Sequence, residues 1–160
     1  MTRAANGRPR AAGAPGGSQS GLPEVRSLRE LTELVTRSPD LFVRYSRGPD
    51  HDAGESSRDY EAEVDMPGLS VTTISPEPWW TRPAEDWIAR RVCQYNDLRR
   101  DSSDERRPWL LRGRVVGAGP DHEPLVVDVV PVAWIGESAI AEAKRRYQER
   151  FHVGRDSTDD

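Results

Sequence analysis

The chain has 160 residues, of which 35% are apolar and 31% are charged, and its formal net charge is −4 at pH 7. This length suits one folded domain, because domains commonly have ~100–150 residues. No apolar run reaches the ~18–20 residues of a membrane helix, and the basic N-terminal residues lack the apolar core of a secretory signal. We therefore expect a cytoplasmic protein with no membrane partner. The single cysteine, Cys93, excludes an internal disulfide framework and a zinc site built from several cysteines.

The two ends of the chain differ in composition from its middle. Residues 1–23 are rich in Ala, Gly and Arg, and residues 153–160 are polar and acidic. Neither end offers enough apolar surface to offset the entropy that a chain loses when it becomes ordered. We predict a disordered N-terminal tail over 1–23, a single domain over 24–152 and a disordered acidic C-terminal tail over 153–160.

The first half of this domain is predicted to contain one helix and two strands. Ser27 begins a capping box for a helix that ends before Pro39, since the residue before a proline is driven out of helical geometry. Strands are predicted over 41–46, where side chains alternate, and over 68–75, which is rich in Val, Thr and Ile. The acid-rich segment 47–67 between them has no clear periodicity. We expect it to be a long loop, a feature that is commonly functional or mobile.

The second half is predicted to contain a helix, a hairpin and a final helix. A helix over 83–98 begins with a proline, which is favoured at that position. The apolar segments 109–116 and 125–134 are joined by a loop rich in Gly and Pro, so we expect them to form an antiparallel hairpin. Pro131 cannot donate a ladder hydrogen bond, which places its strand at an edge or marks a bulge. A last helix is predicted over 138–151.

The resulting order of elements is α-β-β-α-β-β-α. Two pairs of strands flanked by helices indicate an α+β fold with a mostly antiparallel sheet of about four strands. The pattern leaves open whether this sheet stays flat or curls into a barrel-like form.

Several strings occur together in this chain: RYSRG, PGLSV, PEPWWTRP, CQY and VGAGPDHEPLVVDVVPVAW. As a set, they resemble an uncharacterised family of small proteins from high-GC bacteria that is defined as a domain of unknown function. The likeness covers about residues 25–150. The resemblance implies no activity, substrate or fold.

One arrangement of polar residues resembles an enzyme site. Arg44 lies on the first predicted strand, Ser70 on the second and Glu123 in the later hairpin loop. The order resembles the Arg–Ser–Glu layout of ADP-ribosyltransferases, although the Ser-Thr-Ser run and the Glu-x-Glu pair of that layout are missing. The resemblance implies that Arg44 holds the phosphates of NAD, the Ser/Thr strand supports the pocket and Glu123 orients the attacking nucleophile. The alternative is an ion pair between Arg44 and an acid of the 50–65 segment.

Arg91 is the second unusual residue. Helical spacing places it between Trp87 and Tyr95, inside the apolar stripe of the 83–98 helix. A guanidinium removed from water needs a carboxylate or a bound anion. One interpretation is therefore a clamp for a phosphate or carboxylate ligand. The other is that the Arg91 stem lies on the core while its charged end reaches water or an internal acid.

Trp79 and Trp80 follow the rigid Pro-Glu-Pro segment and are suited to contact a partner, or alternatively to seal the open end of the sheet.

The triplets 50–52 and 121–123 contain metal-ligand residue types, but adjacent residues seldom face one ion, and we predict solvated turns and no metal site. Cys93 has neighbouring acids that disfavour a thiolate, so we expect it to be packed and not nucleophilic.

These features lead us to predict a small interaction or ligand-binding module without catalytic machinery of its own. Its binding residues would be Arg44, Arg91, Trp79 and Trp80, its partner a protein or a small anionic ligand, and no cofactor is predicted.

Two other interpretations remain open. The first is a transferase or hydrolase that uses a nucleotide such as NAD and is built on Arg44, Arg91 and Glu123, with Ser70 beside them. The second is a nucleic-acid accessory factor that uses the basic N-terminal tail and the arginines of residues 99–114. The net acidic charge disfavours a nucleic-acid partner, since affinity for nucleic acid usually rests on neutralising phosphates.

Overall fold

The structure is a computed structural model that describes residues 21–96 and 105–151 of the chain. Most of the two predicted tails, and the end of the predicted 83–98 helix, lie outside these residues. The helices are α1 (Leu28–Arg37), α2 (Pro49–Asp52), α3 (Ala84–Asn96) and α4 (Glu137–Phe151). The strands are β1 (Glu24–Val25), β2 (Phe42–Ser46), β3 (Arg58–Asp59), β4 (Val64–Asp65), β5 (Leu69–Ser70), β6 (Thr72–Thr73), β7 (Arg107–Ala118) and β8 (Pro124–Ile135). The predicted α+β class is confirmed.

The main sheet has six strands in the order β1-β8-β7-β2-β6, and β5 also pairs with β8. The long β7–β8 hairpin is antiparallel, as predicted, and β1 is the one strand that pairs in parallel among the described residues. The prediction of about four strands is wrong for two reasons. The two-residue strand β1 is too short to leave a periodic signal, and the predicted 68–75 strand divides into β5 and β6.

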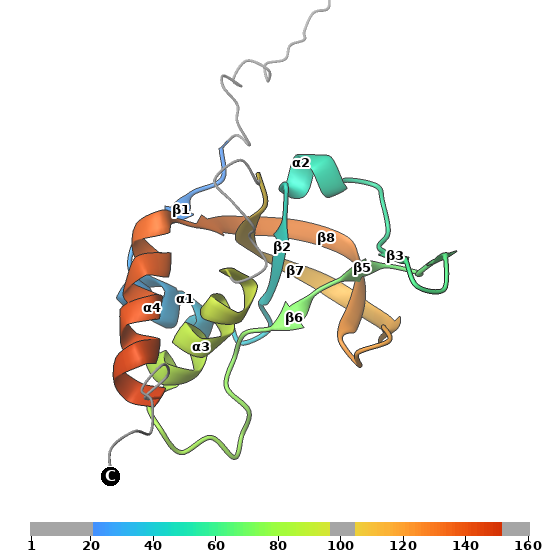
Figure 1. The fold of residues 1–160 in the computed structure, drawn as a ribbon. Helices are drawn as coiled ribbons and strands as arrows, with labels where there is room; N and C mark the ends of the chain where they lie inside the picture. The colour runs from blue at the N-terminus through green and yellow to red at the C-terminus, as the bar shows by residue number, and fades with distance from the viewer. Residues whose placement is uncertain (1–20, 97–104, 152–160) are drawn as a thin grey trace, which may run out of the picture.

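This division is what curls the sheet. β5 pairs with β8, whereas β6 pairs with β2 at the other side of the sheet, and only Val71 separates them. Val71 itself donates from its backbone N to the oxygen of Pro124. One short segment therefore joins both sides of the β8-β7-β2 layer, and Figure 1 shows the sheet bent around it. Of the two forms that the sequence left open, the structure has the curled one.

The helix boundaries follow local rules. Ser27 caps α1, since its Oγ accepts from the backbone N of Glu30 at 3.0 Å. The Glu30 carboxylate accepts from the backbone N of Arg26 at 2.9 Å, one residue earlier than in a standard capping box. α1 ends at Arg37, before Pro39, as predicted.

The predicted irregularity at Pro131 is confirmed. Pro131 lies opposite Leu111, next to a register shift in the β7–β8 pairing. A second shift falls near Asp128, whose φ of 56° is unusual for a residue other than glycine. Bulges such as these bend a strand and increase its twist, which helps β8 to follow the curl.

The acid-rich 47–67 segment is not the unstructured loop that we predict from its sequence. It contains α2 and the β3–β4 hairpin, a separate two-stranded sheet that projects from the body of the fold (Figure 1). Both elements are too short for periodicity to reveal them, and each is held by local contacts. In the hairpin, Arg58 pairs with Asp65 at 2.9 Å and donates to the oxygen of Glu63.

Two hydrophobic cores lie on opposite sides of the sheet. The larger one joins α1, α3 and α4 to one face of the strands and includes the fully buried Ile88 and Leu110. The smaller one, inside the curl, surrounds Trp109 and includes Val126 and Trp134. Full burial of such side chains stabilises a fold by ~1.5–3 kcal/mol each. Among the described residues, no helix is long and apolar enough to cross a membrane.

Candidate functional site

Two cavities open on the side of the curled sheet away from α1, α3 and α4. The first, called here the Arg44 cavity, has a volume of about 450 Å³. Its wall includes Arg44, His51, Ser57, Ser70, Asp121 and Glu123. The second, called here the edge cavity, has a volume of about 600 Å³ and lies against β8, α2 and the residues before β5. The two cavities share Asp52, Glu55, Ser56 and Leu69 in their walls, so they are neighbours.

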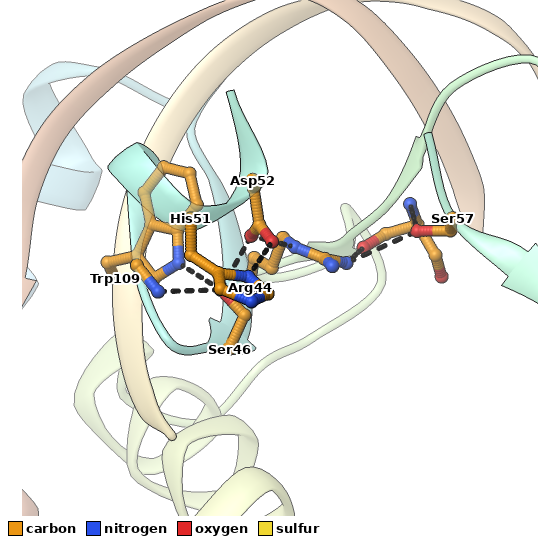
Figure 2. A network of polar contacts seen from close by, with 8 residues as sticks. Arg44, Ser46, His51, Asp52, Ser57 and Trp109 are labelled. Atoms are coloured by element: carbon orange, nitrogen blue, oxygen red, sulfur yellow. Dashed lines mark hydrogen bonds and ion pairs between the residues drawn. The ribbon is translucent and has the colours of Figure 1, made fainter. Parts of the chain in front are cut away.

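Arg44 projects from the central strand β2 and forms an ion pair with Asp52. Its Nε donates to Asp52 Oδ2 at 2.6 Å, and the Asp52 side chain is only 7% exposed. The predicted ion pair between Arg44 and an acid of the 50–65 segment is therefore confirmed. Figure 2 shows the two side chains meeting between β2 and α2.

Gly48 and α2 bring Asp52 to this position. Gly48 precedes α2 with a φ of 121°, a conformation that favours glycine, and a Cβ at this position would meet the ring of Trp134. The backbone N of Asp52 donates to the oxygen of Gly48, which closes the single turn of α2. The turn directs the Asp52 side chain back toward β2.

Ser46 connects this ion pair to the core. Its Oγ donates to Asp52 Oδ2 at 2.6 Å and accepts from Trp109 Nε1 at 2.9 Å. The backbone N of Gly48 also donates to Ser46 Oγ. A buried polar group is stable when it is hydrogen-bonded in this way, and the network fixes Asp52 against a rigid wall (Figure 2).

The surroundings of Asp52 keep it ionised. Burial raises the pKa of its carboxyl, but hydrogen bonds from Arg44 and Ser46 and the nearby Arg44 charge lower it. The result is a pKa below the ordinary value of 3.8. His51 adds a smaller lowering effect on the Asp52 pKa, although its Nδ1 is 3.4 Å from Asp52 Oδ1, a long contact, and its side chain is half exposed.

Arg44 also reaches the strand that carries Ser70. Its Nη1 donates to the backbone oxygen of Ser70 at 2.8 Å and to Ser57 Oγ at 3.4 Å. Ser57 Oγ accepts in addition from the backbone N of Ser70. Nη2 makes no hydrogen bond with the part of the chain that the structure describes. Arg44 is thus held by Nε and Nη1, and Nη2 keeps two N–H groups for a ligand.

Glu123 is held by hydrogen bonds in the wall of the Arg44 cavity. Its Oε2 accepts from Ser70 Oγ at 2.8 Å, and its Oε1 accepts from the backbone N of Asp121 at 2.9 Å. Hydrogen bonds between Gly119 and Glu123, and between His122 and Gly119, close the turn between β7 and β8. A Cβ on Gly119 would collide with the Glu123 carboxylate. The turn is therefore shaped to hold this carboxylate in one orientation.

The structure thus brings together three of the residues that we single out in the sequence. Arg44, Ser70 and Glu123 line one cavity and are linked by consecutive hydrogen bonds through Ser70. Arg91 does not belong to this group.

The other predicted binding residues lie among the helices. Arg91 is half-buried, its guanidinium lies 5.2 Å from the centre of the Trp87 ring, and its Nη1 is 3.4 Å from Gln94 Oε1. Trp80 packs against the helical core and donates from Nε1 to the oxygen of Pro83. Trp79 is 68% exposed and touches Trp80 and Trp87 edge-on. Neither cavity has any of these side chains in its wall.

The structure also locates the cysteine, the two acidic triplets and the arginines that the sequence analysis considers. Cys93 is buried in the helical core, as expected. Both acidic triplets contribute to the Arg44 cavity, but no group of three or more His, Cys, Asp or Glu within 21–96 and 105–151 could hold a metal ion. Arg99 and Arg100 lie outside the described residues. Of the later arginines in the proposed nucleic-acid surface, three pair with acids: Arg107 with Glu24, Arg112 with Asp40 and Arg114 with Asp128.

Three site residues are missing from the sequence-based prediction. Asp52 is one of many acids in its segment, and nothing in the sequence distinguishes the one that is buried. Ser57 is one of two consecutive serines. Gly119 is the easiest of the three to predict from sequence. A glycine shortly before a candidate carboxylate suggests that the carboxylate packs closely against the backbone, where a Cβ would not fit.

Comparison with family models assigns the chain to a family. The model of a family described as "Family of unknown function (DUF6098)" matches residues 18–158, and the chain belongs to that family. The predicted resemblance to an uncharacterised family is therefore confirmed. No curated protein and no solved structure matches the chain.

Proposed function

We propose that the Arg44 cavity binds NAD and that the protein cleaves the bond between nicotinamide and ribose, transferring ADP-ribose to an acceptor or to water. This is the enzymatic interpretation of the sequence, with Arg91 removed from the site. The observation that carries it is the Ser70–Glu123 hydrogen bond in a cavity that Arg44 also lines.

The role of Arg44 follows from its free donors. Because Asp52 and Ser70 hold Nε and Nη1, the guanidinium is fixed before a ligand arrives, and Nη2 can donate to a phosphate oxygen. Preorganisation of this kind raises affinity, since fewer rotamers are lost on binding. The Asp52 carboxylate neutralises part of the Arg44 charge, so we assign Arg44 to orienting the diphosphate more than to attracting it.

The role of Glu123 follows from its orientation. When the bond from the ribose C1′ to the nicotinamide nitrogen breaks, its electron pair leaves with nicotinamide and positive charge develops on the ribose. A fixed carboxylate beside that carbon stabilises the charge. An oxygen or nitrogen of the acceptor then bonds to C1′, and its proton passes to Glu123. Ser70 and the Asp121 N–H, which donate to Glu123, act as positioning groups.

The size of the cavity is compatible with part of such a ligand. Ligand sites in proteins commonly have volumes of ~300–1,000 Å³, and the Arg44 cavity lies in this range. The exposed Tyr60 side chain stands at its rim and offers an aromatic surface for a base.

The test is release of nicotinamide from NAD by the purified chain, followed by chromatography. We expect Glu123→Gln to lower the rate by about a hundredfold or more, which is typical when a group that stabilises transition-state charge is removed. Arg44→Lys keeps a charge but loses the fork of donors, so it should raise KM. Glu61→Gln, an exposed acid outside the cavity wall, is the matched control and should have no effect.

A binding measurement accompanies the rate. ADP-ribose at a hundred times its Kd should stabilise the chain by ~2.7 kcal/mol in thermal unfolding. Glu123→Gln should keep most of this stabilisation, whereas Arg44→Lys should lose it. If NAD stays intact and ADP-ribose gives no stabilisation, the proposed function is wrong.

A further inference from the structure

The edge cavity has a feature that cleavage of NAD does not use. β7 occupies one edge of β8 along its length, so β1 and β5 both pair with the other edge. β5 reaches Leu125 and Val126, and β1 reaches Trp134 and Ile135. Residues 127–133 of β8 lie between them, and on this edge, away from β7, they have no partner strand among residues 21–96 and 105–151.

An open strand edge of this kind is a template for another extended chain. Its backbone groups lack ladder partners, and a peptide that adds there gains a row of hydrogen bonds. Pro131 has no N–H to offer, and the bulge at Asp128 interrupts the ladder, so such pairing is confined to a few backbone hydrogen bonds from the Val127–Val130 stretch. The edge cavity lies directly on this stretch, since Val127, Asp128 and Val129 form part of its wall.

The other walls select the chemistry of the occupant. Pro49, Leu69 and Val129 provide apolar contacts, and Asp50, Glu55 and Asp128 provide carboxylates. Within the part of the chain that the structure describes, no Lys, Arg or His lines the edge cavity. Asp50 and Glu55 have no ion-pair partner within the described residues, and both are exposed. Asp128, in contrast, pairs with Arg114 at 3.1 Å, so the unpaired negative charge of the groove comes from Asp50 and Glu55.

We propose that the open edge of β8 between β5 and β1 binds an extended, basic segment of a partner protein as an added β-strand. Its backbone pairs with residues 127–130, its apolar side chains face the wall of the edge cavity, and its Arg or Lys side chains meet Asp50, Glu55 and Asp128. The volume of about 600 Å³ is in the range that binding sites commonly have.

This segment also fits the role of the ADP-ribose acceptor, an assignment that rests on the proposed function. The two cavities share Asp52, Glu55, Ser56 and Leu69, so a segment on the β8 edge lies against the wall of the Arg44 cavity. The substrate class is then a basic protein segment in extended form.

The first experiment measures binding without NAD. The probe is a fluorescein-labelled eight-residue peptide in which Arg and Val alternate, titrated with the full chain and followed by fluorescence anisotropy. A second peptide carries N-methyl groups on alternate backbone nitrogens and keeps every side chain. We expect the methylated peptide to bind at least tenfold more weakly. Equal binding of the two peptides, or no binding of either, overturns strand addition.

The second experiment locates the site with matched variants. Asp50→Asn combined with Asp128→Asn removes two carboxylates that line only the edge cavity, and should weaken the unmethylated peptide about tenfold. Glu61→Gln combined with Glu63→Gln removes two exposed acids from the neighbouring hairpin, and should leave binding unchanged. If both pairs weaken binding equally, the attraction is diffuse and the proposed site is wrong.

Two further measurements, one with a competitor peptide and one with a Glu123 variant, distinguish the possible occupants and separate peptide binding from NAD cleavage. A peptide of residues 2–20, the basic N-terminal segment, is used as a competitor. If it displaces the probe at equal concentration, the site binds this chain's own N-terminal segment and the proposal of a partner is overturned.

Glu123→Gln should abolish nicotinamide release and leave peptide binding unchanged. In the wild-type chain, absence of NAD cleavage with intact peptide binding counts against the proposed function, whereas absence of peptide binding with intact NAD cleavage counts against the strand site. If NAD is cleaved and the peptide is bound but not modified, the acceptor role is wrong.

Discussion

The two sides of the sheet are stabilised in different ways. The helical side is a dry core in which α1, α3 and α4 cover the strands with apolar side chains such as Leu31, Ile88 and Leu110. The curled side has a smaller core around Trp109, and its wall is a network of charges and hydroxyls beside two cavities. Apolar packing tolerates no open space, whereas a polar network can border a cavity because water or a ligand completes its hydrogen bonds. The helical side therefore supplies stability, and the curled side carries the candidate site.

The largest loss of stability is expected from a substitution in the core on the helical side. Leu110→Ala leaves a cavity in the fully buried core and should lower the free energy of unfolding by ~2–5 kcal/mol. Urea unfolding measures it. Val115→Ala, on the exposed part of the same strand, is the control and should cost less than about 1 kcal/mol. Equal costs at the two positions would show that the helical side is not the tighter core.

The next effect should come from the buried ion pair on the curled side. Asp52→Asn removes the charge that Arg44 and Ser46 stabilise, and should lower the free energy of unfolding by roughly 2–3 kcal/mol at pH 7. Asp50→Asn, two residues earlier and exposed, is the control and should change stability by less than about 0.5 kcal/mol.

The pH dependence of this effect has a definite sign. Because folding lowers the pKa of Asp52, its ionised form stabilises the fold fully above pH 3.8, and this contribution is lost as the pH falls through the lowered pKa. The difference in stability between the wild type and Asp52→Asn should therefore shrink below about pH 4. A difference that stays constant from pH 7 to pH 2 would contradict the ionised state of Asp52.

A smaller effect on stability, with a larger one on activity, is expected at the turn that holds Glu123. Gly119→Ala forces the Glu123 carboxylate to move, because a Cβ at this position collides with it. The carboxylate lies at the end of a flexible side chain, so stability should fall by less than about 1 kcal/mol. Nicotinamide release should fall by about tenfold or more, since the orientation of Glu123 is lost. Gly117→Ala, which meets open space, is the control.

The smallest effect is expected at the exposed aromatic residue of the helical side. Trp79→Ala removes a side chain that is 68% exposed and should change the free energy of unfolding by about 0.5 kcal/mol or less, as judged by thermal unfolding. Trp80→Ala, which removes packing against the helical core, is the comparison and should cost at least ~2 kcal/mol. A large cost at Trp79 would show that it belongs to the core.

The sequence anticipated the helical side better than the curled side. The helix that ends at Arg37 has a cap, both it and the helix that ends at Phe151 have apolar stripes that local rules can read, and the long hairpin has two apolar strands around one loop. The curled side depends on β5 and β6, which have two residues each, and on the four-residue α2. Elements this short form because of their tertiary partners, so their own residues contain almost no signal.

The candidate site shows the same division. The order of residue types along the chain places an arginine on an early strand, a serine on the next and a glutamate in the hairpin loop. Long-range packing is what brings Arg44, Ser70 and Glu123 to one cavity, pairs Asp52 and not another acid with Arg44, and keeps Arg91 apart. The physical reason is that local rules act over a few residues, whereas the site depends on how Val71 carries the chain from β8 to β2 and closes the curl.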